Sequence, residues 1–180
     1  MFDKSKADMK SIIFFANVFI IFFTLGFKSV NADITAKVQR VVDGDTIHVI
    51  DTSGQKFKVR LIGIDAPEKN QLFGLASTYH LSEILLNKWV LLESKTKKGK
   101  PYSVDRYNRV LAKIMLHDKD INLLQVSSGY AWHFKRYQKQ QSPSDRESYS
   151  QAELSAKKNK LGLWKEKKPI APWKWRKIKK

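Results

Sequence analysis

The chain has 180 residues, no cysteine, and a formal net charge of +17 at pH 7, with a pI of about 10.0. Without cysteine, disulfides, thiolate metal sites and a cysteine nucleophile are excluded. Hydrophobic residues make up 42%, enough for the packed core of one domain. The excess of Lys and Arg indicates a polyanionic partner, because basic side chains neutralise phosphates and release their counterions. A solvated basic surface, or an arm that touches anionic membrane, is the alternative.

The N-terminus has the pattern of a signal peptide. Three lysines within the first ten residues precede an apolar run at 11–25, and small residues follow at 30–32. The run is shorter than the roughly 20 residues that span a bilayer. We therefore expect residues 1–32 to be removed after Ala32, and the protein to be exported to the periplasm or the medium. The alternative is an uncleaved membrane anchor through residues 11–27.

Three strands are predicted next. Residues 34–50 are rich in β-branched side chains and are interrupted by Asp43-Gly44-Asp45, which predicts two strands joined by a tight turn. A second turn at 51–54 leads to a strand at 56–64. On that strand Arg60 shares its face with Ile62 and Ile64. Arg60 therefore needs a partner, since an unpaired buried charge is costly.

Helices and further strands alternate after residue 67. Apolar residues three or four apart predict a helix at 73–87, and strands follow at 89–93 and 110–116, separated by a basic loop at 94–102. Asp120 is the expected cap of a helix that ends near Ser128. Ser144 and Glu147 stand at capping-box spacing and predict a helix over 145–158.

This order predicts an α+β, mainly β fold: a five-stranded OB-type barrel with three helices, over residues 33–164. A basic tail containing Trp and Pro covers 165–180. Between 157 and 180, eleven Lys or Arg accompany a single Glu. Trp173 and Trp175 lie among these basic residues, a composition that suits single strands or a phosphate backbone, although packing on the domain is the alternative. For Trp164 we favour packing.

Two acids could form a hard-oxygen metal site. Asp45 follows a turn and Asp65 closes a strand, so both could project from one end of the barrel. Calcium accepts six to eight oxygen ligands, including water and main-chain carbonyls, in irregular geometry. The Asp-Gly-Asp sequence taken alone is more often a simple turn.

Other charged residues suit the cleavage of a phosphodiester. Glu68 could take a proton from an attacking water, or could be an acid at a helix start. Arg60 and Arg109 could bind phosphate oxygens with two donors each. An ion pair with a nearby acid is the alternative for Arg109.

These segments closely resemble the staphylococcal nuclease family. The resemblance is carried by short sequences spread from residue 34 to residue 164, in the family's order and spacing. They are Val42-Asp43-Gly44-Asp45-Thr46, residues 60–68, residues 71–74, residues 105–112, residues 124–131 and residues 152–164. The closing Pro172-Trp173-Lys174-Trp175-Arg176 is similar to the tail of exported Gram-negative members.

The resemblance implies an OB barrel with three helices and one Ca²⁺. The metal would be held by Asp45, Asp65 and the main-chain oxygen of Ala66. Glu68 falls on the family's general base, and two phosphate-binding arginines and three nucleotide-binding residues are also implied: Arg60 and Arg109, then Arg106, Tyr107 and Tyr137. The implied enzyme is a monomeric endonuclease that needs no stable protein partner. It would hydrolyse DNA and RNA to 3′-phosphate ends.

Two other functions compete with this one. A non-catalytic OB module could bind nucleic acid through its basic face, but such modules need none of the acids and arginines that are present. A nuclease with Mg²⁺ and an imidazole base is a second rival. His48 and His117 lack the asparagine-bearing surroundings that this class requires, so we do not favour it.

Overall fold

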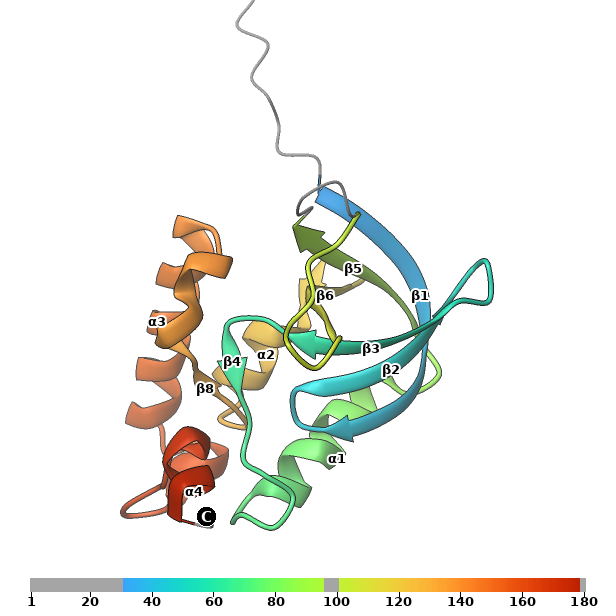
Figure 1. Ribbon diagram of the computed structural model, residues 1–180. Coiled ribbons are helices and arrows are strands. Elements are labelled where there is room, and N and C mark those ends of the chain that lie inside the picture. The colour runs from blue at the N-terminus through green and yellow to red at the C-terminus, as the bar shows by residue number, and fades with distance from the viewer. Residues whose placement is uncertain (1–30, 96–100, 179–180) are drawn as a thin grey trace, which may run out of the picture.

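Five strands form a barrel in the computed structural model, which describes residues 31–95 and 101–178. They are β1 (Asn31–Asp43), β2 (Thr46–Asp51), β3 (Lys56–Leu61), β5 (Trp89–Lys95) and β6 (Val110–Leu116). Antiparallel pairs give the order β3-β2-β1-β5-β6, and a parallel pairing of β3 with β6 closes the barrel (Figure 1). The predicted five-stranded OB-type barrel is confirmed.

Alternating side chains place one face of each strand in the core. In β3, Phe57, Val59 and Leu61 are buried while Lys58 points to solvent. β1 pairs with β2 on one side and β5 on the other, and its register with β2 shifts after Val38 and again after Val41. Such irregularities bend a strand, which helps a five-stranded sheet to close.

Three of the helices correspond to the predicted ones. α1 (Gly74–Leu85) lies beside one end of the barrel, and α2 (Ile121–Ser127) lies between the barrel and α3 (Pro143–Lys158) (Figure 1). Asp120 caps α2 as predicted, by accepting a hydrogen bond from the Leu123 amide at 2.9 Å. The predicted capping box of α3 is wrong. The cap is Ser142, whose Oγ accepts from the Asp145 amide at 3.0 Å, because Pro143 fits the first helical position.

Shorter elements complete the chain. β4 (Ile64–Asp65) pairs with β8 (Trp132–His133), and β7 (Lys119–Asp120) extends the main sheet beside β6. Two 3₁₀ segments, η1 (Lys135–Gln140) and η2 (Gly162–Lys165), flank α3. Trp164 is 8% exposed and contributes to a small apolar cluster with Ala156 and Leu163, in agreement with its predicted packing role.

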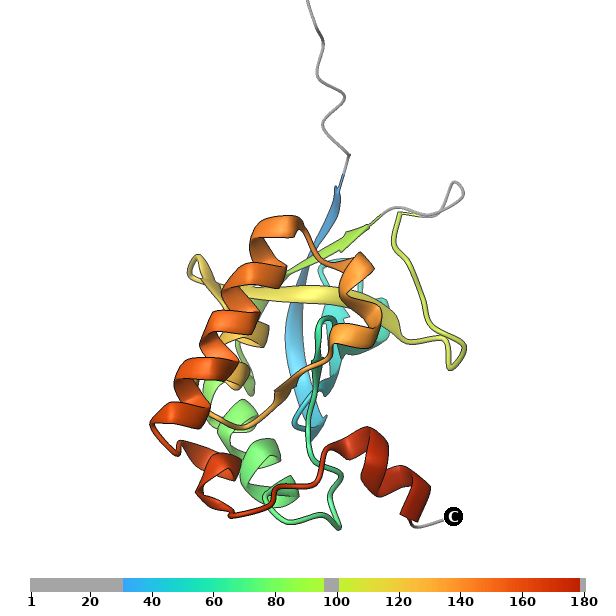
Figure 2. The ribbon, with the colours of Figure 1, turned by 90° about the vertical axis from the view of Figure 1, so that its left-hand side faces the viewer.

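The tail contains a helix that the sequence analysis missed, α4 (Pro172–Ile178). Figure 2 shows α4 beyond the end of α3, with its axis running in a different direction from that of α3. Ala171 and Pro172 are buried at its start, and the Trp173 ring stacks on Phe134 with centroids 5.2 Å apart. Part of the predicted basic tail is therefore an ordered element of the domain.

Residues 1–30 of the predicted signal peptide, which covers 1–32, and residues 96–100 of the basic loop lie outside the described residues. Residues 31–32 form the start of β1. Within the described ranges, no helix has the length and apolar character needed to cross a membrane.

The buried side chain of His133 makes the stability of the fold depend on pH. The residue is 2% exposed, and its ring has Nε2 3.0 Å from Gln141 Oε1 and Nδ1 3.2 Å from Ser150 Oγ. Burial lowers the pKa of His133 below its usual value, and the hydrogen bond with Gln141 only partly opposes this. The unfolded chain therefore binds a proton near pH 6.5 that the folded chain resists.

We accordingly predict that the free energy of unfolding falls as the pH is lowered from 7.5 to 5, as measured by urea denaturation. In His133→Gln this fall should be smaller, because the amide does not titrate. His117→Gln, at an exposed turn, is the control and should keep the wild-type pH dependence. An equal pH dependence in wild type and His133→Gln would contradict the assignment.

Candidate active site

The turn from β1 to β2 presents Asp45 at one end of the barrel. The Asp45 amide donates to Asp43 Oδ1 at 3.0 Å, and Gln125 Nε2 donates to the Gly44 carbonyl at 2.8 Å. A Cβ atom at Gly44 would lie 1.8 Å from Ser77 Oγ, so the turn packs too closely on α1 for any other residue. Two helices thus fix the position of Asp45.

Asp65 is held by a second set of contacts. After β3 the chain turns at residues 62–63 and enters β4, where Asp65 pairs with Trp132 of β8. Asn122 of α2 stabilises this turn, since its Nδ2 donates to the Ile62 carbonyl at 3.0 Å. The side chain of Asp65 is 2% exposed. The metal-ligand candidates are therefore on separate, rigid segments.

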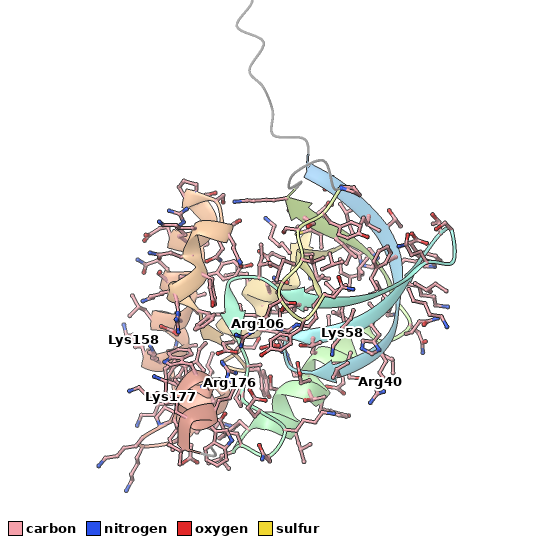
Figure 3. The ribbon with its side chains drawn as sticks, viewed as in Figure 1. Arg40, Lys58, Arg106, Lys158, Arg176 and Lys177 are labelled. Atoms are coloured by element: carbon pink, nitrogen blue, oxygen red, sulfur yellow. The ribbon has the colours of Figure 1, made fainter. Side chains whose placement is uncertain are left out.

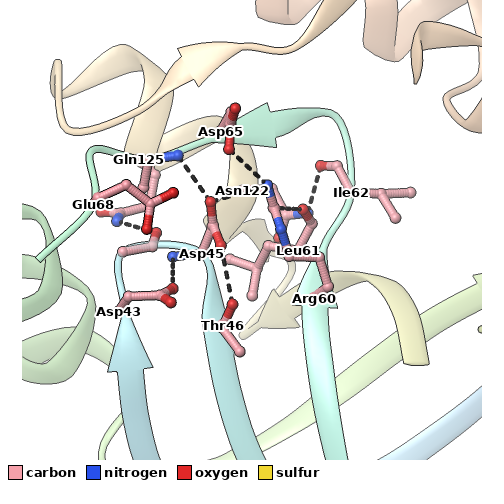
Figure 4. A network of polar contacts seen from close by, with 12 residues as sticks. Asp43, Asp45, Thr46, Arg60, Leu61, Ile62, Asp65, Glu68, Asn122 and Gln125 are labelled. Atoms are coloured by element: carbon pink, nitrogen blue, oxygen red, sulfur yellow. Dashed lines mark hydrogen bonds and ion pairs between the residues drawn. The ribbon is translucent and has the colours of Figure 1, made fainter. Parts of the chain in front are cut away.

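Arg60 brings the two acids together. Its Nη2 atom lies 3.0 Å from Asp45 Oδ2 and 3.1 Å from Asp65 Oδ1, and Nη1 donates to the Leu61 carbonyl at 2.6 Å (Figure 4). Asp45 Oδ2 also accepts from the Ala66 amide at 2.8 Å. The half-buried Arg60 thus has the charged partners that its place in the sequence required, and both carboxylates point at one position.

Negative charge is concentrated on this end of the barrel. Burial raises the pKa of Asp65, and the opposing effects of Arg176 and Arg60 are smaller. Burial, followed by the charge of Asp45, raises the pKa of Asp43 to about 6. Both shifts have the direction expected where carboxylates are crowded and partly removed from water.

Glu68 lies beyond Asp65 in an irregular segment. α1 begins only at Gly74, so the alternative that Glu68 is a helix-start acid is wrong. Its amide donates to Gln71 Oε1 at 3.2 Å, and its side chain is 38% exposed. Glu68 Oε1 lies 2.7 Å from Nη1 of Arg176 in α4. The carboxylate is thus within reach of water and beside Asp43, Asp45 and Asp65, the acidic cluster.

Arg176 was absent from the predicted site. Its Nη2 lies 2.7 Å from Asp65 Oδ2, and its Nη1 lies 3.3 Å from Asp65 Oδ1. Partial burial lowers the pKa of Arg176, but the hydrogen bonds to Asp65 and Glu68 outweigh burial and raise it. The guanidinium therefore stays charged and bridges the two acids.

Arg109 reaches the same cluster from the loop before β6. Its Nη2 pairs with Asp105 Oδ2 at 2.7 Å, so the ion pair considered as the alternative exists. Its Nη1 also lies 3.4 Å from Thr46 Oγ1, which donates to Asp45 Oδ1 at 3.0 Å. The ion pair orients the arginine beside Asp45, so the two interpretations of Arg109 are compatible.

The nucleotide-binding candidates fall into two groups. Tyr107 is 62% exposed and lies under both Arg106 and Arg109, whose guanidinium carbons are 4.7 and 5.5 Å from its ring centroid. Tyr137 is 50% exposed on η1, where its contacts are with Phe134 and Arg136. The structure therefore links Tyr107 and Arg106 to Arg109, while Tyr137 lies in a separate aromatic group.

The donor set of the acidic cluster suits a hard cation. Asp45 and Asp65 each offer carboxylate oxygens that already converge on a positive group. Among the described residues, no group of three or more His, Cys, Asp or Glu side chains could hold a metal ion. A calcium ion here would need main-chain oxygen and water as well, which calcium commonly accepts.

Sequence reasoning missed several residues that build the site. In the sequence, Asp43 was interpreted only as part of a turn, although a second carboxylate two residues before Asp45 could have indicated that it belongs to the site. Asn122 and Gln125 carried no signal, because buried amides that fix distant loops are recognised only in the fold. The Trp-Lys-Trp-Arg sequence marked Arg176 as basic but not its destination.

Comparisons with known proteins identify the family of this chain. The family described as "Staphylococcal nuclease homologue" matches residues 58–166, a range that includes Arg60, Asp65, Glu68 and Arg109. An "Uncharacterized endonuclease" of Haemophilus influenzae is 39% identical over 146 residues, which cover 81% of this chain and 75% of the relative.

Two further relatives are similar over most of their length. A "Micrococcal nuclease" of Shigella flexneri is 34% identical over 158 residues, covering 83% of this chain and 84% of the relative. An "Uncharacterized endonuclease" of Escherichia coli is 32% identical over 158 residues, covering 87% of this chain and 94% of the relative. The closed barrel fits the staphylococcal nuclease family. The chain therefore belongs to this family, as the family match and these relatives show.

Proposed function

We propose that the chain is a calcium-dependent endonuclease that hydrolyses phosphodiester bonds of DNA and RNA and leaves 3′-phosphate ends. The observation that carries the proposal is the convergence of Asp45 and Asp65 on Arg60, with Arg109 and Glu68 alongside. Membership of a nuclease family and relatives named as nucleases support the reaction class.

Asp45, Asp65 and the main-chain oxygen of Ala66 would hold the ion. Bound calcium would stabilise negative charge on a phosphoryl oxygen and orient an attacking water. The two carboxylates are fixed by the Gly44 turn and by β4, so binding would require little rearrangement of the main chain.

The arginines would act on the phosphate. Guanidinium groups donate to phosphate oxygens in pairs and keep their charge at any physiological pH. Arg60 is tied to the acids and Arg109 to Asp105, so both are oriented before substrate arrives. Fixed donors stabilise the charge that develops on phosphorus without reorganisation during the reaction.

Glu68 would accept the proton of the attacking water. Its side chain is 38% exposed and contacts Arg176, which joins it to Asp65. A carboxylate at this position can exchange protons with solvent between turnovers, as a general base must.

Aromatic and basic side chains beside Arg109 would bind the nucleotides next to the scissile phosphate. Figure 3 shows Arg40 and Lys58 over the barrel and Lys158 and Lys177 over the helices, so positive charge extends beyond the acidic cluster and would attract nucleic acid from a distance. Tyr107 and Arg106 lie beside Arg109, where they could contact a nucleotide, and Tyr137 offers a second exposed ring.

The first test is the cleavage of plasmid DNA and of RNA by residues 33–180, with calcium and with a calcium chelator. We expect degradation with calcium, protection by the chelator, and 3′-phosphate ends on the products. Binding without cleavage at every calcium concentration would instead favour a non-catalytic OB module. Cleavage that persists in the chelator would contradict the calcium requirement.

The second test separates charge from donor geometry at the arginines. Arg60→Lys and Arg109→Lys keep the charge but lose the paired donors, so each should lower kcat by about 10²- to 10³-fold, with a much smaller change in KM. Arg40→Lys, at an exposed position of β1, is the control and should cleave at the wild-type rate. Thermal unfolding would verify that the variants are folded. Near-wild-type kcat in both site variants would contradict the proposed roles.

We also propose that the protein is exported. The lysines, apolar run and small residues of 1–32 support a cleaved signal peptide rather than an anchor. N-terminal sequencing of protein expressed in a Gram-negative host should find Asp33 as the first residue in the periplasm or medium. Protein that keeps residues 1–32 in the membrane fraction would favour the anchor.

A further inference from the structure

α4 docks on the domain through contacts that do not involve Arg176. The Trp173 ring packs on Phe134 and, edge to face, on Trp132, with centroids 5.2 and 5.6 Å apart. Just before the helix, the Ile170 carbonyl accepts from Gln71 Nε2 at 2.6 Å. The helix is therefore anchored by aromatic packing and by a hydrogen bond from the Gln71 side chain to the segment before it, and it presents Arg176 to the acidic cluster.

Arg176 occupies the oxygens that a metal would need. Its two Nη atoms contact both oxygens of Asp65, and Nη1 also contacts Glu68 Oε1 at 2.7 Å. Arg60 takes a second contact with Asp65 Oδ1 at 3.1 Å. Both Asp65 oxygens are thus engaged by guanidinium donors, one of which comes from 111 residues further along the chain.

We propose that Arg176 is a tethered cation that competes with calcium for Asp65, so that the C-terminal helix raises the calcium concentration at which the site fills. The inference rests on the proposed calcium site. A calcium ion binds carboxylate oxygen at about 2.3–2.6 Å, which displaces a hydrogen-bonded guanidinium and repels its charge. Arg176 must therefore leave Asp65 before calcium can bind there.

The position of Arg176 allows this exchange. Its side chain is 44% exposed, against 13% for Arg60, so it can rotate toward solvent. This rotation frees Asp65 Oδ2, opposite the Oδ1 atom that Arg60 binds. The anchoring contacts of α4 involve Trp173 and the segment before the helix, so the exchange does not require the helix to undock. Because binding is reciprocal, whatever weakens the Arg176 contact strengthens calcium binding.

Calorimetric titration with calcium chloride tests the proposal without relying on cleavage. Arg176→Gln removes the competing charge and should lower the Kd for calcium about three- to fivefold, the effect expected for a partly exposed ion pair. Lys177→Gln removes the same charge from the same exposed helix and should bind calcium like wild type. Arg176→Lys should lie between wild type and Arg176→Gln, since an ammonium group cannot contact both acids as a guanidinium does.

The outcomes separate this inference from the proposed function. Equal calcium affinity in Arg176→Gln and Lys177→Gln would overturn the competition while leaving the calcium-dependent nuclease intact. Weaker binding in Arg176→Gln would overturn it as well, because the arginine would then support the site. No calcium binding by wild type or any variant, together with cleavage in the chelator, would overturn both.

Discussion

The ion pairs that join Arg60 to Asp45 and Asp65 are the constraint on which the site depends. The three residues come from β3, from the turn after β1 and from β4. They meet because β3 pairs with β2, which places Arg60 opposite Thr46, and because the chain turns back after β3. Two carboxylates buried this deeply would be unfavourable without a positive partner. Arg60 makes the two acids tolerable in the folded state, and it leaves Asp65 Oδ2, opposite the oxygen that it binds, to a second cation.

Hydrogen bonds and ion pairs from neighbouring side chains fix the segments that carry these charged residues. Gln125 binds the Gly44 carbonyl and Asn122 binds the Ile62 carbonyl, so α2 holds both acid-bearing segments. Asp105 orients Arg109 in the same manner. Each charged group is thus placed by a neighbour that is itself packed, which is the arrangement that preorganised catalysis requires. Arg176 departs from this pattern, because the contacts that hold its guanidinium are with the acids themselves, Asp65 and Glu68.

Local sequence patterns predicted the barrel and pointed to several residues of the candidate site. Alternation in the strand predicted at 56–64 placed Arg60 among apolar residues and indicated that it needs a partner, but it did not identify Asp45 and Asp65 as that partner. What could not be predicted depends on contacts between distant segments. The docking of α4 requires Trp173 to meet Phe134 and Trp132. β4 and β8 have two residues each, too few for periodicity, and they exist because the barrel brings them together. At α3 the cap is Ser142 and not the predicted Ser144, because Pro143 fits the first helical position.

The family resemblance supplied the roles, whereas the structure supplied the connections between them. Arg176 joins Glu68 to Asp65 through ion pairs, and Thr46 joins Arg109 to Asp45 through hydrogen bonds. A crystal structure of the calcium-loaded protein tests this account most directly. It should show the ion bound by Asp45 and Asp65, with Arg176 moved away from Asp65 and α4 still docked. Calcium bound elsewhere, with Arg176 still on both oxygens of Asp65, would contradict it.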